Sequence, residues 1–166
     1  YRFEDQELMY RAFRHPSYVY ESNEHGIPDN QRLEFLGDSV INLAISHLLM
    51  QSFPQMKEGE LSKRRASLVS ETGLYPIACE LNLGDYLLLC KGEERTQGRK
   101  KPSILTDAFE ALIGAIYLDG GFPDAMRVIG KLFRPVLTKS GLGKAFIDYK
   151  TELQEVSQDV FQATPE

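Results

Sequence analysis

Apolar residues recur at intervals of three and four along most of the chain, and this spacing limits the possible folds more than any other feature. It places apolar side chains on one face of an α-helix. Alternating runs of β-branched residues, which would indicate strands, are almost absent. With 166 residues and 42% hydrophobic content, the chain can bury one core but is short for two. We therefore expect an all-α fold with one complete domain.

Glycine and proline divide this pattern into separate helices. A first helix is expected over residues 5–14, ending before Pro16, and a loop over residues 22–29. The central helix, closed by Phe53 and Pro54, should bury an apolar stripe that consists of Leu33, Leu36, Val40, Leu43, Ala44 and Leu48. Further helices are expected over residues 58–70, 73–81 (stopped by Gly84), 103–118 (ended by Gly120 and Gly121), 124–137 and 148–159. Residues 91–101 are interpreted as a polar loop.

Two pairs of acidic residues lie on two of these helices. Glu34 and Asp38 are four residues apart on the central helix, on a face away from its apolar stripe. Asp107 and Glu110 are three apart in a segment that is otherwise nearly all apolar or small. Like charges at this spacing repel each other within a helix. If the two helices pack together, four carboxylates converge. Such a ligand set suits Mg²⁺, which Mn²⁺ can replace. An ordinary solvated acidic face is the alternative, which the apolar surroundings of the second pair weaken.

Four segments around these acids carry a family resemblance. They are HPSY at 15–18, QRLEFLGDS at 31–39, EGELS at 58–62 and DAFEALIGA at 107–115. In this order they resemble the ribonuclease III family, from residue 1 to about residue 137. The resemblance implies a homodimeric helical endonuclease domain, here residues 1–143. Gln31 departs from the acid often found at the first signature position in bacterial members, which bears on rate or selectivity rather than on the reaction.

The resemblance also implies an activity. The chain would be a Mg²⁺-dependent endoribonuclease that cleaves double-stranded RNA by two-metal-type hydrolysis and acts in processing of ribosomal and messenger RNA. Its products would carry 5′-phosphates, 3′-hydroxyls and short 3′ overhangs. The implied metal ligands are Glu34, Asp38, Asp107 and Glu110, with Asp38 and Glu110 as catalytic residues. Phe35 would enter a pocket on the other subunit; a simple core position is the alternative for this side chain.

Any RNA contacts should be local, because the formal net charge of −5 does not suit a generally basic binder. The family implies a role at the RNA strand for Glu58. Lys63 and Arg64 on one helix, and Arg99 and Lys101 before the second acidic motif, are candidate phosphate contacts. Solvated surface side chains are an equally good interpretation for any single one of these cations.

The tail resembles the opening of another domain. Residues 144–166 are interpreted as a linker and the first helix of a truncated double-stranded-RNA-binding domain, which would need roughly 50 more residues to fold. In a complete domain Thr151, Gln154 and Gln158 would face the RNA. We expect weaker RNA binding than in a full-length enzyme.

Other features point to a reduced compartment and away from membranes. Cys79 and Cys90 lack the spacing of a zinc site, and a cytoplasmic location is expected. We expect no membrane span, because no apolar run approaches the roughly 20 residues that cross a bilayer. The histidines His15, His25 and His47 are interpreted as ordinary structural or surface residues.

Two rival functions remain open. A non-catalytic RNA-binding scaffold of the same fold would be favoured by loss of an acid, yet all four positions are acidic. A helical carboxylate protein that binds iron or manganese usually needs Glu-X-X-His pairs. That pattern is absent, since Gly37 and Ile113 stand three residues beyond Glu34 and Glu110.

Overall fold

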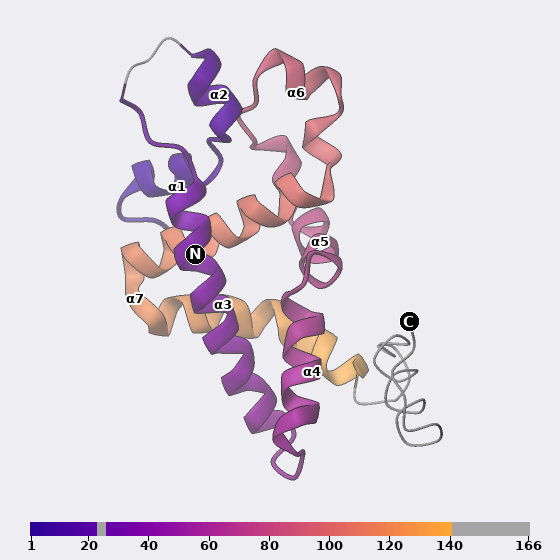
Figure 1. Cartoon of the computed structure of the whole chain (residues 1–166). Coiled ribbons are helices and arrows are strands. Elements are labelled where there is room, and N and C mark those ends of the chain that lie inside the picture. Colours follow the sequence, from indigo (N-terminus) through magenta and orange to yellow (C-terminus); the bar gives the residue numbers. More distant parts are fainter. Residues whose placement is uncertain (23–25, 141–166) are drawn as a thin grey trace.

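The computed structural model describes residues 1–22 and 26–140, which are almost entirely helical (Figure 1). The elements are α1 (Gln6–Ala12), α2 (Pro16–Glu21), α3 (Gln31–Ser52), α4 (Glu58–Val69), α5 (Glu71–Glu80), η1 (Leu83–Asp85), α6 (Lys91–Arg95), η2 (Gly98–Lys100) and α7 (Pro102–Ser140). Within the described ranges, extended pairing is limited to one isolated bridge between Arg14 and Leu88. The prediction of an all-α fold is confirmed.

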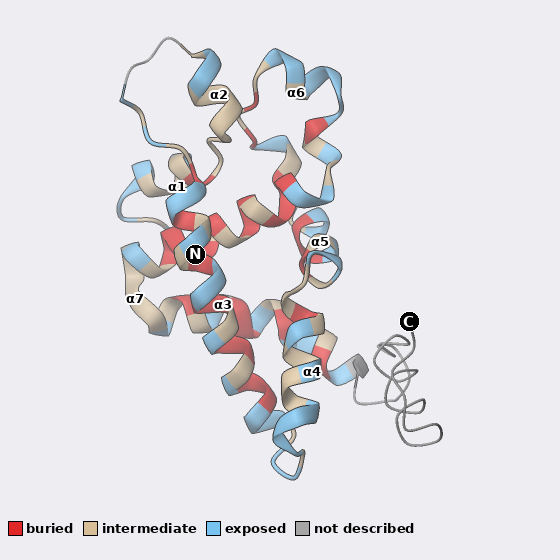
Figure 2. Cartoon of the chain, viewed as in Figure 1, coloured by how far each residue is buried: buried red, intermediate tan, exposed pale blue. Residues whose placement is uncertain are grey.

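The core lies between α3, α5 and α7, where Figure 2 shows the buried residues to be concentrated. The largest fully buried side chains are Phe109 and Phe133, one on each half of α7, with ring centroids 6.5 Å apart. Burying an aromatic ring of this size contributes roughly 2–3 kcal/mol. The two halves of α7 therefore pack against each other through the core.

The predicted stripe of α3 is mostly buried, with one error. Leu33, Val40, Ala44 and Leu48 are buried and Leu36 is half-buried. Leu43, however, is 58% exposed. The buried face is completed instead by residues next to the predicted ones, namely Gly37, Ile41, Ile45 and Leu49. The face is rotated in this way because α3 packs against both α7 and α4.

Two short helices were missed, because each is held by a local cap rather than by apolar spacing. α2 begins at Pro16, a favoured first position, and the His15 side chain accepts a hydrogen bond from the Ser17 N–H. The expected polar loop over residues 91–101 is wrong, since it contains α6 and η2. At the start of α6 the Cys90 sulfur accepts from the Glu93 N–H at 3.3 Å.

The chain breaks occur at residues that tolerate positive φ. Gly121 has φ 76° and ψ −179° and kinks α7, which confirms the predicted end of a helix at this glycine pair. After α5 the stop is Asn82, with φ 52°, rather than Gly84, which lies inside η1. Asn adopts this left-handed conformation more readily than most residues.

The length of α3 corrects the expectation about apolar runs. By length and composition alone, α3 is apolar enough to cross a membrane. The core helix of a globular protein meets the same criterion, and α3 packs along its apolar face against α7.

Candidate metal centre

The first turn of α3 is held in place by the preceding asparagine. Asn30 is buried, its side-chain amide donates to the carbonyl of Ala12 at 3.3 Å, and its N–H donates to the carbonyl of Arg14 at 2.9 Å. These bonds tie the start of α3 to the end of α1. Glu34, which lies in this first turn, is therefore attached to a fixed backbone.

Two glycines let α3 and α7 approach closely. A Cβ at Gly37 would lie far inside contact distance of the Glu110 carbonyl oxygen, and a Cβ at Gly114 would do the same with the carbonyl oxygen of Leu33. The backbones thus touch where any side chain would separate them. This contact lies within one turn of Glu34 on α3 and at Glu110 on α7, so it brings the two acidic motifs together.

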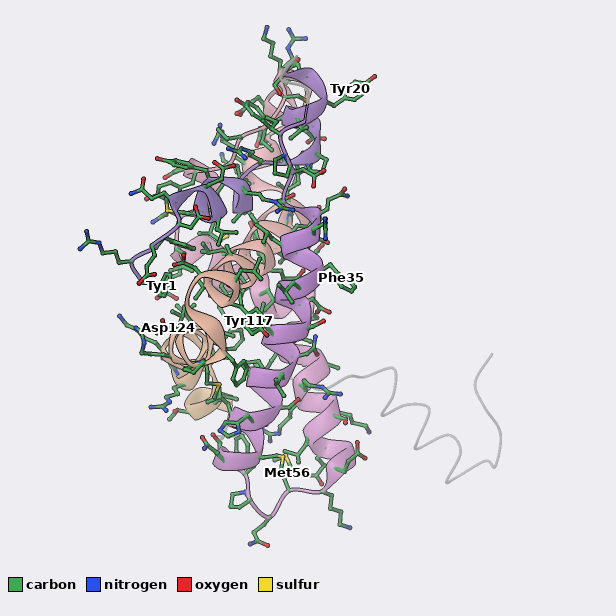
Figure 3. All side chains as sticks on the ribbon, turned by 90° about the vertical axis from the view of Figure 1, so that its left-hand side faces the viewer. Tyr1, Tyr20, Phe35, Met56, Tyr117 and Asp124 are labelled. Carbon is green, nitrogen blue, oxygen red and sulfur yellow. The ribbon has the colours of Figure 1, made fainter. Side chains whose placement is uncertain are left out.

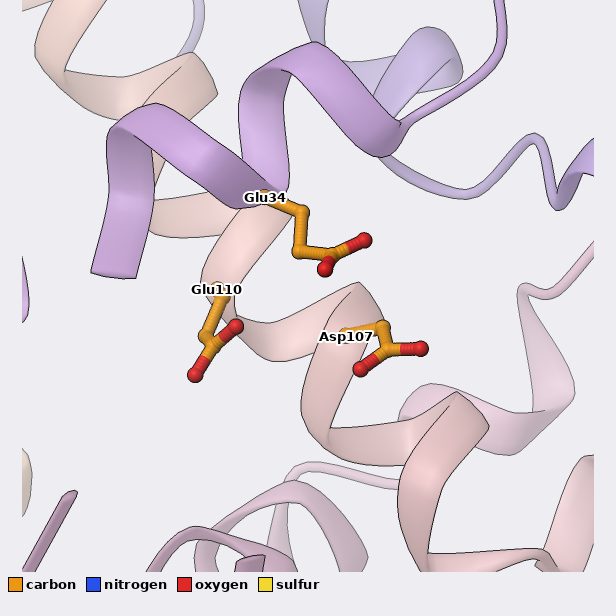
Figure 4. A group of neighbouring side chains, drawn as sticks. All are labelled: Glu34, Asp107 and Glu110. Atoms are coloured by element: carbon orange, nitrogen blue, oxygen red, sulfur yellow. The ribbon is translucent and has the colours of Figure 1, made fainter. Parts of the chain in front are cut away.

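Three of the four predicted ligands converge at this crossing. Glu34 on α3 and Asp107 and Glu110 on α7 each offer a carboxylate oxygen within 4.8 Å of the others, and all three side chains are half-buried. Figure 4 shows the Glu34 side chain extending from α3 toward the two acids on α7. The prediction that the two acidic pairs meet across a helix contact is thereby supported for these three residues.

The cluster is electrostatically costly without a cation. Burial, followed by the charges of Asp38, Asp107 and Glu34, raises the pKa of Glu110 from 4.5 to about 8. Burial is also the main cause that raises the pKa of Glu34, and Asp107, Asp29 and Asp38 add to it. At neutral pH the carboxyl of Glu110 is therefore largely protonated, and a divalent cation would favour its ionised form.

Asp107 has two neighbours that the sequence did not single out. Burial is the largest cause raising its pKa, whereas His15 lowers it and Glu71 raises it. His15 stands at the start of α2 and Glu71 at the start of α5, so the first residues of both helices lie near enough to Asp107 to influence its pKa. The position of His15 in the HPSY segment was the one sequence feature that could have indicated its nearness to Asp107. From the sequence alone this histidine is interpreted as an ordinary structural or surface residue.

Asp38 lies outside the close group of three. Its carboxylate is exposed and accepts a hydrogen bond from the Asn42 side-chain amide at 2.8 Å. It is near enough to help raise the pKa of Glu110. Asp38 therefore borders the cluster, and its role as a ligand stays a prediction.

The candidate RNA contacts on α4 do not join the cluster. Glu58 accepts from the Ser62 hydroxyl at 2.7 Å in the first turn of the helix. Lys63 is exposed, and the Arg64 guanidinium lies 4.8 Å from the centroid of the Phe53 ring. Arg64 thus has a structural contact, and the RNA roles of all three residues stay predictions.

The two cations before the second motif are paired with glutamates. Arg99 donates to Glu94 at 3.0 Å and to the carbonyl of Gly84 at 2.7 Å. Lys101 donates to Glu93 at 2.6 Å. Both side chains fasten α6 and η2, so phosphate contacts would have to compete with these ion pairs.

Phe35 is 77% exposed, which excludes the alternative of a core position in this chain. In Figure 3 it projects outward from α3 at one edge of the molecule. An exposed aromatic ring beside acidic residues suits a partner surface. Its contact with a second subunit stays a prediction. Three predictions about the tail lie outside the described residues. They are the RNA-facing positions Thr151, Gln154 and Gln158, the helix expected over residues 148–159, and the domain division at residues 143 and 144.

The chain is similar to known proteins over nearly its full length. Residues 5–136 match a family described as ribonuclease-III-like. Over 99% of its length the chain is 51% identical to ribonuclease 3 of Syntrophobacter fumaroxidans, of which it covers 70%. It is 46% identical to ribonuclease 3 of Syntrophotalea carbinolica over its whole length, covering 72% of that protein. A solved nuclease domain of ribonuclease III from Campylobacter jejuni, described as flexible in a region involved in dimer formation, is 43% identical, with a TM-score of 0.75 over 81% of this chain and 90% of that one.

Proposed function

Because the chain belongs to the ribonuclease III family, we propose that it is an endonuclease that hydrolyses double-stranded RNA with the help of Mg²⁺. The observation that carries the proposal is the convergence of Glu34, Asp107 and Glu110 within 4.8 Å at the crossing of α3 and α7. Ionising all three half-buried carboxyl groups together is costly because their charges repel, and a divalent cation offsets that repulsion.

The ligand chemistry favours Mg²⁺, with Mn²⁺ as a substitute. The group consists of carboxylate oxygens, the ligands that hard divalent cations prefer. Within the described part of the chain it includes no histidine, which disfavours the iron or manganese redox site considered above. Bound Mg²⁺ would supply a water of lowered pKa and stabilise charge on the phosphate oxygens.

The residues of the chain have distinct parts in this proposal. Asp107 and Glu110 present their carboxylates from α7, while Glu34 closes the group from α3. A bound cation would favour the ionised form of Glu110, so binding would release the proton that the raised pKa of this carboxyl retains. Asp38, oriented by Asn42, completes the acidic set in a two-metal-type hydrolysis. The proposed products are 5′-phosphate and 3′-hydroxyl ends.

A homodimer joined through Phe35 would place two such centres in one assembly. Since Phe35 is exposed, it is available for a contact with a second copy. Symmetry would then present one centre to each RNA strand, which accounts for short 3′ overhangs. Processing of ribosomal and messenger RNA in the cytoplasm is the proposed setting, and the free thiols of Cys79 and Cys90 are compatible with a reducing compartment.

The test is cleavage of a long perfect RNA duplex in Mg²⁺ by the unaltered chain and by Glu110→Gln. Altering outer-shell partners of a metal already costs roughly 10- to 100-fold, so loss of a ligand should lower the rate by more than about 100-fold. Glu80→Gln, an exposed glutamate at the end of α5, is the matched control and should cut normally.

Ca²⁺ in place of Mg²⁺ and single-stranded RNA of the same sequence are further controls, and neither should support cutting. Equal rates for the Glu110 and Glu80 variants would overturn the proposed site. Tight duplex binding without any cutting by a folded, Mg²⁺-loaded dimer would favour the scaffold function instead.

A further inference from the structure

The second half of α7 has a groove on its outward face, which we call the basic groove. Its volume is about 800 Å³, and Arg127, Gly130, Lys131 and Arg134 line it together with flanking apolar side chains such as Met126. Gly130 is itself buried, and a Cβ added there would lie in ordinary contact with the Arg134 Nε, at 3.9 Å, so the floor of the groove lies beside the Arg134 side chain. Among the described residues, those that line the groove come from this one stretch of helix.

The groove faces away from the core. The inner face of this helix is buried through Ala125, Ile129, Phe133 and Leu137. Arg127, Lys131 and Arg134 lie on another face and are exposed. Their spacing of four and three residues aligns the three cations along the helix. The groove is thus a separate surface that packing among residues 1–22 and 26–140 does not use.

Its charge is opposite to that of the whole chain, which has a formal net charge of −5. Arg127 pairs with Asp124 at 2.6 Å, an exposed pair of modest strength. In the range 26–140, Lys131 and Arg134 take part in no ion pair with the described side chains. Two cations beside an open groove are therefore available to an anionic ligand.

The location of the groove separates it from the proposed functional surfaces. In Figure 3 Asp124, the partner of Arg127, lies on the opposite side of the molecule from Phe35. The end of the groove beside Arg127 therefore lies away from Phe35. It is also separated from the acidic cluster by the core in which Phe133 packs on Phe109.

We propose that the basic groove is a docking site for an acidic amphipathic helix of a partner protein. Apolar side chains of Pro123, Met126 and Pro135 lie among the cations, and phosphate groups would leave them without a partner. A helix with one apolar stripe and flanking glutamates would satisfy both kinds of contact. The lining runs from residue 123 to residue 138, which corresponds to about 22 Å of helix, or some four turns of a ligand.

The test measures fluorescence anisotropy of a labelled 16-residue peptide with leucines on one helical face and glutamates beside them. The full chain should bind this peptide. Lys131→Glu/Arg134→Glu should weaken binding at least about tenfold, because the attraction between the two cations and the peptide glutamates is replaced by repulsion. Lys57→Glu/Arg95→Glu is the matched control, because it changes the net charge equally at exposed cations elsewhere. This control should retain most of the affinity.

A second variant tests the shape of the groove without altering charge. Gly130→Leu places a bulky side chain on the floor beside Arg134 and should also weaken peptide binding about tenfold, while thermal unfolding confirms that the protein is folded. A scrambled peptide of the same composition should bind much more weakly. Equal binding of both peptides, or equal losses in the two charge-reversed pairs, would refute the proposal.

Duplex RNA serves as the competing probe. If Lys131→Glu/Arg134→Glu weakened RNA binding and left the peptide unaffected, the groove would be an RNA surface and the proposal would be wrong. We expect these variants to cleave duplex RNA at the normal rate, because they lie apart from the acidic cluster. Failure of this inference therefore leaves the proposed nuclease function untouched.

Discussion

Glu110 stabilises or destabilises the metal-free fold according to pH. Its carboxyl has a pKa of about 8 in the folded chain and 4.5 ordinarily, chiefly because it is buried. The folded state therefore binds more protons than the unfolded state between these values. Its contribution is fully present below pH 4.5 and is lost as the pH rises through about 8.

We predict that Glu110→Gln raises the free energy of unfolding of the metal-free protein at pH 8.5 and changes it little at pH 4.5. Because the site is partly hydrated, the expected gain is about 1–2 kcal/mol rather than the full value of the pKa difference. Urea unfolding in chelator at both pH values measures it, with Glu80→Gln as the control. The same gain at both pH values would contradict this account.

Cation binding at the cluster should depend on the same proton. We predict that Mg²⁺ raises the Tm of the unaltered chain more at pH 8.5 than at pH 6, since the Glu110 carboxyl must lose its proton before it can bind a cation. Thermal unfolding across a Mg²⁺ titration measures the difference. In Glu110→Gln the dependence on pH should be much flatter, and an unchanged dependence would mean that another group controls binding.

At the scale of elements, the close contact of α3 and α7 should control both stability and the site. We predict that Gly37→Ala or Gly114→Ala lowers stability by about 2 kcal/mol or more, because each new methyl group meets backbone of the other helix. Separation of the helices should also weaken the Mg²⁺-dependent rise in Tm. Both effects are measured in one thermal unfolding series with and without Mg²⁺.

Gly59→Ala is the matched control for these glycine variants. It lies in α4 with open space around the added methyl group, so the substitution should stabilise the helix by about 0.5–1 kcal/mol. The two kinds of glycine should thus respond with opposite sign. Gain of stability in Gly37→Ala would show that the two helices are free to move apart.

The elements show what sequence patterns reveal and what they miss. Apolar spacing predicted α3 and both halves of α7, since long amphipathic helices repeat their signal, and the break at Gly121 was also expected. α2 and α6 were missed because the side chains of His15 and Cys90 cap them without such a repeat. Leu43 was misplaced because apolar spacing does not define how α3 is rotated toward its neighbours.

The candidate site, too, was predicted only in part from the sequence. The two acidic motifs predicted that four carboxylates would converge if their helices packed together, and the helix crossing brings three of them, Glu34, Asp107 and Glu110, within 4.8 Å of one another. The contact that makes this possible depends on Gly37 and Gly114, and residues without side chains leave no mark in an apolar pattern. The nearness of His15 to Asp107 also arises only from tertiary packing, so the spacing of residues in the sequence does not predict it.

At the scale of the whole molecule, the outward face of α3 exposes several large apolar side chains to solvent. Phe35, Leu43 and Met50 are exposed by 77%, 58% and 65%. They fall on one side of the helix, at intervals of eight and seven residues. Exposed apolar side chains grouped in this way are typical of a protein interface.

We therefore predict that Phe35→Ala weakens self-association of the chain by at least about 30-fold, the effect expected of a central aromatic anchor. Sedimentation velocity over a range of concentrations measures it. Leu118→Ala, an exposed apolar residue on α7 rather than α3, is the control and should associate normally. The Phe35 variant should keep its Mg²⁺-dependent rise in Tm, because the acidic cluster is made within one chain. A dimer of undiminished affinity would show that the exposed ring serves something other than subunit contact.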